Sequence, residues 1–273
     1  MIYRVSAQAS RHARLTSPPP TARARYLTAL ALAVSMLCCH LAADAAARQL
    51  QVSARAPASA PLMIAGVRVA YEGLRASRQL PRCTPPDVRH LPRAMSAIRD
   101  FSSRYNERAM SLLDTVVLCG TLGDGEDAWI RGLYDPQKRM ILVELDHHDD
   151  TVYVLHHEFS SLLMAASGDL SGFRRRWVQH NRGTYNAAYG DSSAQPWRVD
   201  WTLYRRGFLH PYGQTSFEND LNIIAGFVMS SYLHERLRQA SLAPAIRAKV
   251  TLAHDFMRPW LKSPVAIARV IGV

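Results

Sequence analysis

Long apolar runs and glycine-rich phosphate loops are both missing from this chain of 273 residues. The first apolar stretch, Tyr26 to Leu37, has about a dozen residues, whereas a membrane-spanning helix needs about 20. No second apolar span and no internal repeat follow it. The glycines of residues 120–125 lack the lysine and the helix that a phosphate-binding loop requires. The sequence therefore argues against a nucleotide site and against a membrane span beyond the first stretch.

Aromatic residues make up only 8% of the chain, and none accompany its basic residues at regular spacing. The formal net charge is +11, but five arginines and Asp44 lie in the first 47 residues, which leaves +7 for residues 48–273. The densest basic run is Arg174-Arg175-Arg176. Basicity of this kind supports only non-specific affinity for nucleic acids. We therefore expect a solvated basic surface and no nucleic-acid partner.

The first 47 residues have the three parts of a secretory signal. Five arginines and no acidic residue precede the apolar stretch, and Ala43-Asp44-Ala45 and Ala45-Ala46-Ala47 place small residues where a signal peptidase reads them. The sequence thus predicts a signal peptide over residues 1–47 and an exported protein, periplasmic or secreted. An uncleaved membrane anchor is the alternative. A lipid anchor on Cys38 or Cys39 is disfavoured, because Leu37 stands where a small residue is needed.

Cysteine is scarce, and only Cys83 and Cys119 follow the signal. In an oxidising compartment these two residues could form one disulfide. Two reduced, buried thiols are the alternative, and the sequence leaves both open.

The rest of the chain is organised as a tether and one domain. Residues 48–66 are rich in alanine, serine and proline, as in a tether, and residues 67–273 are long enough for a single domain. The apolar patterns predict strands and helices in mixed order, which favours an α+β fold with a small antiparallel or mixed sheet and a mainly helical C-terminal part. Strands are expected at 67–71, 113–119 and, as a hairpin, 129–130 with 139–145; helices at 87–104, 152–166, 216–239 and 242–258; residues 167–215 show little periodicity.

The helix expected at 152–166 carries two histidines and a glutamate. At 100° per residue, its large apolar side chains fall on one arc, which is the expected core face. His157, Glu158 and Ser161 fall together on a neighbouring arc, so they can share one cleft. His156 lies on the other side of the apolar arc and is not expected to join them.

His157 and Glu158 match the first half of the His-Glu-x-x-His pattern. In that pattern, two histidines one helical turn apart bind zinc, and the glutamate beside the first activates the bound water. The fifth position is Ser161 in this chain. Serine is a poor zinc ligand, so the ligand set predicted from this helix is incomplete.

These residues resemble an exported bacterial group of candidate zinc-binding metallopeptidases with a zincin-like fold. The resemblance implies zinc as the cofactor, with His157 as a ligand and Glu158 as the general base. It implies an edge strand at 140–145 that runs antiparallel to bound peptide, and a later helix that supplies a third ligand, usually glutamate. It also implies that Tyr212 steadies an oxyanion. The matching segments are 116–122, Tyr134 with 140–143, 156–163, 207–213 and 216–222, within residues 85–258.

The third ligand has no direct match, because the glutamate of the related proteins falls on Ile223 or Gly226. Glu218 and Asp220 are the remaining carboxylates. Residues 215–218 fit a capping box, so Glu218 is interpreted as a cap of its own helix. Asp220 shares an apolar face, where a carboxylate is costly unless it is paired or bound to metal. We therefore predict Asp220 as the metal ligand, with Glu218 second.

Two further groups of histidines are weaker candidates. His147 and His148, with Asp149 and Asp150, form either a surface metal cluster or, more simply, the polar turn that leads into the next helix. His210 stands just before the helix that starts near residue 216, and could complete the ligand set, as could His156.

Two functional hypotheses follow. The first is an exported zinc-dependent metallopeptidase of zincin type, with His157, Asp220 and Glu218 as metal ligands and Glu158 and Tyr212 as catalytic residues. The second is a zincin-shaped protein without catalysis, in which His157, Glu158 and Ser161 form a buried polar network and the groove binds a peptide or protein partner. The oligomeric state leaves no signal in the sequence.

Overall fold

The structure is a computed structural model, and it describes residues 62–73, 81–123, 130–147, 149–186, 199–263 and 270. These residues belong to one compact unit that spans Pro61–Val273. The expected signal peptide and residues 48–61 of the expected tether lie outside the described residues, so both stay predictions. Among the helices of the described residues, none is long and apolar enough to cross a membrane.

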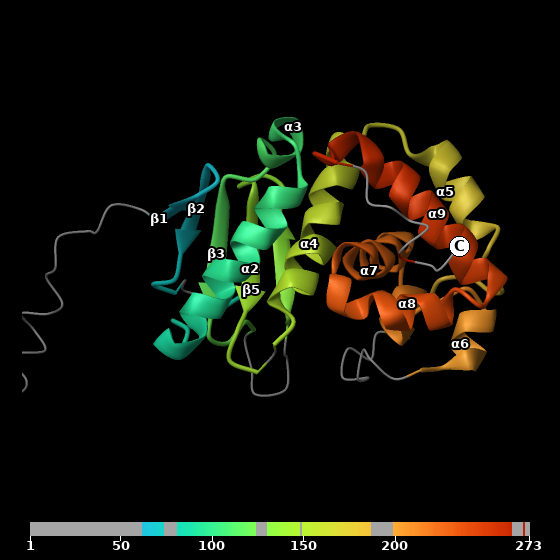
Figure 1. The fold of residues 1–273 in the computed structure, drawn as a ribbon, viewed down its shortest axis with the longest axis horizontal. Helices are drawn as coiled ribbons and strands as arrows, with labels where there is room; N and C mark the ends of the chain where they lie inside the picture. The colour runs from blue at the N-terminus through green and yellow to red at the C-terminus, as the bar shows by residue number, and fades with distance from the viewer. Residues whose placement is uncertain are drawn as a thin grey trace, which may run out of the picture. The chain divides into compact units, whose positions relative to one another are not determined.

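A five-stranded mixed sheet forms one part of the unit (Figure 1), in the order β1-β2-β3-β5-β4. Its two central pairings, β2 with β3 and β3 with β5, are parallel, and the outer strands β1 and β4 pair antiparallel. With the helices that follow, this confirms the α+β prediction. The strands are β1 Leu62–Ile64, β2 Val67–Ala70, β3 Thr115–Cys119, β4 Gly132–Asp135 and β5 Met140–Glu144.

The expected edge strand at 140–145 is wrong. β5 is an inner strand, because the hairpin turn after Asp135 folds β4 back beside it, with Tyr134 opposite Ile141. All five residues of β5 are buried, which fits a strand covered on both edges. The edge of the sheet on this side is β4, and it pairs with no further strand in the described part of the chain.

Helices cover one face of the sheet and build the C-terminal part (Figure 1). α4 packs against α2, β4 and β5 on one side and against α7 on the other. It therefore joins the sheet to the C-terminal helices. The α-helices are α2 Leu91–Arg104, α3 Glu107–Met110, α4 Thr151–Ala166, α5 Ser171–Val178, α6 Trp201–Arg205, α7 Phe217–Met229, α8 His234–Ala240 and α9 Pro244–Met257. Short 3-10 helices are Val88–His90, Pro211–Gln214, Ser231–Leu233 and Arg258–Trp260.

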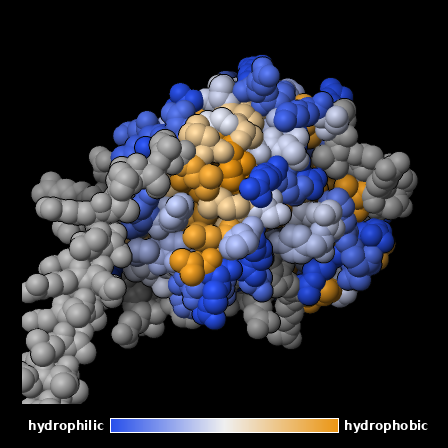
Figure 2. Space-filling model, turned by 60° about the vertical axis from the view of Figure 1, so that its left-hand side comes forward, coloured by the Kyte–Doolittle hydropathy of each residue, from blue (hydrophilic) through white to orange (hydrophobic). Residues whose placement is uncertain are grey.

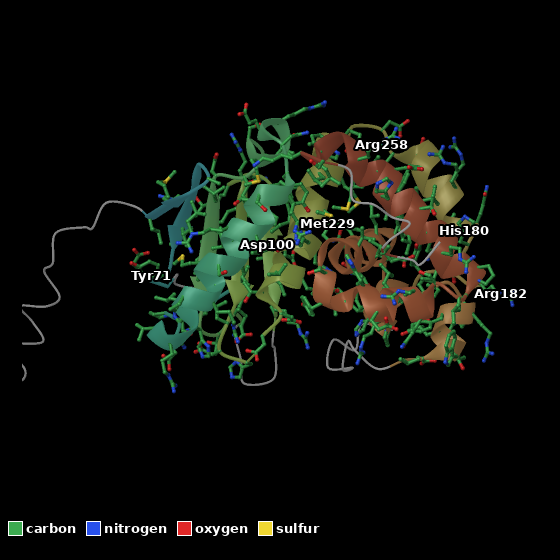
Figure 3. The ribbon with its side chains drawn as sticks, in the orientation of Figure 1. Tyr71, Asp100, His180, Arg182, Met229 and Arg258 are labelled. Atoms are coloured by element: carbon green, nitrogen blue, oxygen red, sulfur yellow. A yellow bond between two sulfur atoms is a disulfide. The ribbon has the colours of Figure 1, made fainter. Side chains whose placement is uncertain are left out.

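The single helix expected at 216–239 is interrupted. α7 ends at Met229, the extended Ser230 follows, and α8 starts at His234. The imidazole Nε2 of His234 lies 2.9 Å from the carbonyl oxygen of Val228, so it contacts the end of α7. Met229 is fully buried at the junction between the sheet and the C-terminal helices (Figure 3). The stretch 167–215, expected to be irregular, contains α5 and α6.

On the opposite face of the sheet, Cys83 and Leu122 from two loops pack against strand residues. Cys83 and Cys119 form a disulfide there, which decides between the two alternatives for these cysteines. The bridge is part of a small apolar cluster with Val117 and Leu142, whereas the main core lies on the helix-covered face. A space-filling view toward the β1 side shows apolar side chains at the surface (Figure 2), and Leu62 and Met63 of β1 are exposed.

Candidate functional site

The apolar face of α4 anchors the helix as its periodicity predicts. Leu155, Phe159, Leu162 and Leu163 are all buried in the main core. The helix contacts both the sheet and α7, so its remaining faces lie close to residues from distant parts of the sequence. α4 therefore sets the positions of His156, His157, Glu158 and Ser161.

His156 points away from the other three, as expected. It is fully buried against the rings of Phe101 and Tyr105, and its Nδ1 lies 2.9 Å from the Tyr105 hydroxyl. Burial holds the pKa of His156 well below its usual value. This histidine is a neutral core residue.

His157 is only partly buried and lies on the side of α4 that faces Tyr212. Its Nδ1 is 3.4 Å from the Tyr153 hydroxyl, and its ring stacks on Tyr212 with centroids 6.5 Å apart. Burial, with a smaller effect of His210, lowers the pKa of His157 to about 3. The imidazole is therefore neutral at physiological pH, and its Nε2 has no hydrogen-bond partner among the described residues.

Glu158 lies against β4. A side chain at Gly132 would put its Cβ 2.5 Å from Val154 and 2.8 Å from the Glu158 carboxyl oxygen, so the strand approaches α4 this closely only because residue 132 is glycine. Burial first, and the charge of Glu218 second, raise the pKa of Glu158 to about 8. Its carboxyl group is therefore mostly protonated at pH 7, and no described residue forms a hydrogen bond with it.

Ser161 lies in a hydrogen-bond network that joins α4 to α7. Its hydroxyl donates to Glu218 Oε1 at 2.7 Å and accepts from Asn222 Nδ2 at 2.7 Å. Asn222 Oδ1 lies 2.5 Å from the hydroxyl of Ser160. The Tyr134 hydroxyl of β4 donates to the same Glu218 oxygen at 2.8 Å. Both hydrogen-bonding directions of Ser161 are thus occupied.

Glu218 does not cap its own helix, and that interpretation is wrong. The N-cap of α7 is Ser216, whose hydroxyl accepts from the backbone N–H of Asn219. The cap is therefore shifted by one residue, which leaves the Glu218 carboxylate free to reach Ser161 and Tyr134. Burial first, and then its hydrogen bond to Glu218, raise the pKa of Tyr134 to about 12.

Asp220, the preferred metal ligand from the sequence, lies in a different environment. Its carboxylate forms an ion pair with Lys249 of α9 at 2.6 Å and accepts from Trp177 Nε1 and the Tyr185 hydroxyl, each at 2.8 Å. Both Asp220 and Lys249 are fully buried. The structure thus satisfies this carboxylate with a cation and two neutral donors, and it does not bring Asp220 to His157.

Tyr212 does lie beside His157. It lies in the 3-10 helix Pro211–Gln214, and the preceding His210 accepts the Tyr212 backbone N–H at 3.1 Å through its Nδ1. Burial, and next the charge of Glu158, raise the pKa of Tyr212. The structure therefore gathers His157, Glu158, Glu218 and Tyr212 from the expected set, together with Ser161, and leaves out Asp220.

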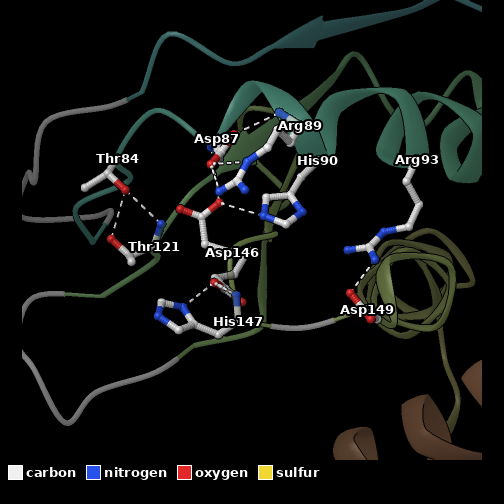
Figure 4. Close-up of polar contacts among 10 residues, drawn as sticks. Thr84, Asp87, Arg89, His90, Arg93, Thr121, Asp146, His147 and Asp149 are labelled. Carbon is white, nitrogen blue, oxygen red and sulfur yellow. Dashed lines mark hydrogen bonds and ion pairs between the residues drawn. The ribbon is translucent and has the colours of Figure 1, made fainter.

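The acidic turn before α4 is held by ion pairs with arginines. Asp149 pairs with Arg93 of α2 (Figure 4). Asp150 pairs with Arg131 at 2.8 Å. The ring of His147 lies 2.7 Å from a carboxylate oxygen of Glu144. His148 lies outside the described residues. These pairs favour the polar-turn interpretation over a surface metal cluster.

A zinc site needs three or four protein ligands around one point. Ser161 supplies a hydroxyl with both hydrogen-bonding directions in use, and Asp220 is paired with Lys249. Across the described ranges, no three side chains of histidine, cysteine, aspartate or glutamate gather closely enough to hold a metal ion. The side chains present therefore do not fit the zinc site that the resemblance implies.

Comparisons with known proteins give one distant structural neighbour to report. No family model and no curated protein matches the chain. A crystal structure of a candidate zinc-binding metallopeptidase from Bacteroides caccae is similar, with 14% sequence identity and a TM-score of 0.47, over 76% of this chain and 85% of that one. A TM-score below 0.5 does not establish a shared fold, so no property of that protein is transferred.

The sequence assigned no role to three residues that decide the contacts of Glu218, Ser161 and Asp220. Tyr134 lies on β4, Asn222 lies one turn after Glu218, and Lys249 lies on α9, far from all of them in the sequence. Asn222 had a usable signal, since an amide on an apolar helix needs a buried partner. Lys249 stands on the apolar side of its helix, where a lysine also requires a buried partner.

Proposed function

We propose that this protein is an exported, zincin-shaped protein that binds an extended peptide in the cleft beside α4, α7 and β4, without zinc-dependent catalysis. The preferred peptide carries a basic side chain. The proposal rests on one observation: at Gly132 the edge strand β4 approaches the Glu158 carboxyl, and in the described residues neither this carboxyl nor the Nε2 of the adjacent His157 has a hydrogen-bond partner.

The open edge of β4 supports the choice of an extended peptide. An edge strand offers a row of unpaired backbone N–H and C=O groups, and a peptide that adds as a further strand satisfies them. The close approach of Gly132 to Glu158 puts this edge next to the polar side chains of α4. Backbone pairing would supply affinity, and the cleft would select one side chain.

The charges of the cleft support the choice of a basic side chain. Glu158 and Glu218 are its acidic groups, and His157 is neutral. The electrostatic influences on Tyr134 and Tyr212 come from these same two glutamates. A lysine or arginine side chain would be attracted to both acidic groups, whereas an acidic side chain would be repelled by them.

Peptide binding tests the proposal directly. Extended peptides that differ at one position should bind the purified protein at least about tenfold more tightly with arginine or lysine there than with glutamate. Glu218→Gln should reduce this preference, while Glu235→Gln, which alters an exposed ion pair on α8, should leave it unchanged. N-methylation of alternate backbone amides should abolish binding. Equal affinity for acidic and basic peptides would refute the proposal.

Zinc-dependent peptide hydrolysis is the second candidate. It is favoured by the adjacent His157 and Glu158, because a zinc hydrolase helix carries a histidine and a glutamate at these two positions. In the described residues, His157 Nε2 and the Glu158 carboxyl have no hydrogen-bond partner. Metal analysis of the purified protein after dialysis separates the two functions. About one zinc per chain, lost in His157→Ala and retained in an inactive Glu158→Gln variant, would favour hydrolysis.

A further inference from the structure

Four side chains from three separate elements meet at Ser161. Ser161 belongs to α4, Glu218 and Asn222 belong to α7, and Tyr134 belongs to β4. The hydrogen bonds among them join residues 57, 61 and 84 positions apart in the sequence. The cluster therefore links three elements that lie far apart in the sequence.

The donors and acceptors of this cluster match. Ser161 donates its one hydroxyl proton to Glu218 and accepts one N–H of Asn222. Glu218 Oε1 receives a second donor from Tyr134. Hydrogen bonds to an ionised acceptor are the stronger kind, and fully paired networks make the surrounding structure rigid.

Ser161 occupies the position on α4 that corresponds to a metal ligand in zinc hydrolases. Residue 161 is one turn after His157, where a zinc hydrolase helix carries its second histidine. The side chain at this position lies within hydrogen-bonding distance of the carboxylate of Glu218 on the neighbouring helix. A metal ion at that point would connect α4 and α7, and the hydrogen bonds of Ser161 make the same connection.

We infer that Ser161, Glu218, Asn222 and Tyr134 form a metal-independent clamp that fixes α7 and β4 against α4 in place of a zinc ion. Glu218, rather than Asp220, is then the carboxylate that a metal at this position would use. One substitution, at residue 161, separates the clamp from a zinc site. The inference does not depend on peptide binding, so failure of the peptide experiment leaves it standing, and its own failure leaves peptide binding open.

Zinc uptake by Ser161→His tests the metal side of the inference. The wild-type chain, purified and dialysed, should hold far less than one zinc per chain, whereas S161H should hold about one and give the absorption bands of tetrahedral Co²⁺ when cobalt is added. Adding Glu218→Gln to S161H should weaken zinc binding by about 10- to 100-fold, while adding Asp220→Asn should not remove the cobalt bands from the protein that remains folded. One zinc in the wild type, lost in His157→Ala, would overturn the inference.

Thermal stability tests the clamp without relying on a new metal site. Ser161→Ala should lower the unfolding temperature by about 5 °C, because it removes one hydrogen bond from Glu218 and, in the described residues, the acceptor of the Asn222 side-chain N–H. Ser167→Ala is the matched control, since the Ser167 hydroxyl donates only to the backbone of its own helix; it should cost about 1 °C. A chelator should change neither value. An unchanged unfolding temperature in S161A, or a folded S161H that takes up no zinc, would contradict the inference.

Discussion

Two carboxylates on the first turn of α7 have opposite environments. Asp220 is fully buried, and a lysine, an indole and a phenol satisfy it. Glu218, two residues earlier, is partly buried and accepts only neutral hydroxyls. The charge of Asp220 is neutralised inside the protein, whereas Glu218 has no cation among the described residues, so its charge remains available to a ligand. The first turn of α7 thus holds a neutralised carboxylate and a carboxylate without a cation, two residues apart.

The largest expected effect on stability comes from removing the buried ion pair of Asp220 with Lys249. Lys249→Met removes the cation and leaves Asp220 buried and unpaired, which should cost about 3–5 kcal/mol of unfolding free energy. Measured by urea denaturation, the double variant Lys249→Met with Asp220→Leu should recover much of that loss. Arg104→Met, at the exposed pair of Arg104 with Asp100, is the control and should cost less than about 1 kcal/mol. A similar small cost for Lys249→Met would show that the buried pair is not structural.

A change distant from both carboxylates tests whether stability and binding are separate. Replacing Cys83 and Cys119 by serine removes a bridge across 36 residues of sequence and should lower the unfolding free energy by about 3 kcal/mol. Peptide affinity, measured well below the unfolding temperature, should not change. Reduced affinity in this variant would mean that general destabilisation, and not the charge of Glu218, governs binding.

The periodic parts of the fold follow from the sequence, and the polar contacts do not. Helical spacing places Leu155 and Phe159 in the core and directs His157 away from His156, because a helix fixes the angle between neighbouring side chains. The hairpin follows from the turn residues near Pro136, but its first strand is Gly132–Asp135 and not the expected 129–130, so Tyr134 lies in the strand and not in the turn. The inner position of β5 does not follow, since strand order depends on contacts between distant segments.

The choice between Asp220 and Glu218 shows the same limit. An aspartate on an apolar helix face indicates that a partner exists, but the spacing of residues does not say whether that partner is a metal or Lys249. The partner lies 29 residues away on another helix. Glu218 was assigned to a local cap because its spacing fits one, and its contact with Ser161 depends on how α4 and α7 pack.

The raised pKa of Glu158 predicts a pH dependence of stability. A carboxyl group whose pKa rises from 4.5 in the unfolded chain to about 8 in the folded chain binds more protons when folded. Its contribution is therefore fully present below about pH 4.5 and is lost as pH rises to about 8. His157, with a folded pKa near 3, acts in the opposite direction below its unfolded value of 6.5.

The difference in unfolding free energy between the wild type and Glu158→Gln isolates the pH dependence that comes from Glu158. Relative to the variant, the wild type should lose about 2 kcal/mol between pH 5 and pH 8, a value reduced for the partial exposure of Glu158. Denaturation curves at several pH values give the difference, and Glu235→Gln is the control. A difference that does not vary with pH would mean that Glu158 has an ordinary pKa, and the cleft would then resemble an exposed surface.

The smallest expected effect comes from removing the tyrosine hydroxyl that donates a hydrogen bond to each carboxylate. Tyr134 donates to Glu218 and Tyr185 donates to Asp220, each at 2.8 Å. Tyr185→Phe removes one donor from a fully buried charge that water does not reach, and it should cost about 1.5 kcal/mol. Tyr134→Phe removes one from a partly buried carboxylate, where water can replace the phenol, and it should cost about 0.5 kcal/mol. Because the two substitutions delete the same atom, their difference in unfolding free energy reports how much more strongly the structure isolates Asp220 than Glu218. A reversed order would mean that the structure isolates Glu218 more strongly than Asp220, and it would remove the basis for assigning Glu218 to a ligand.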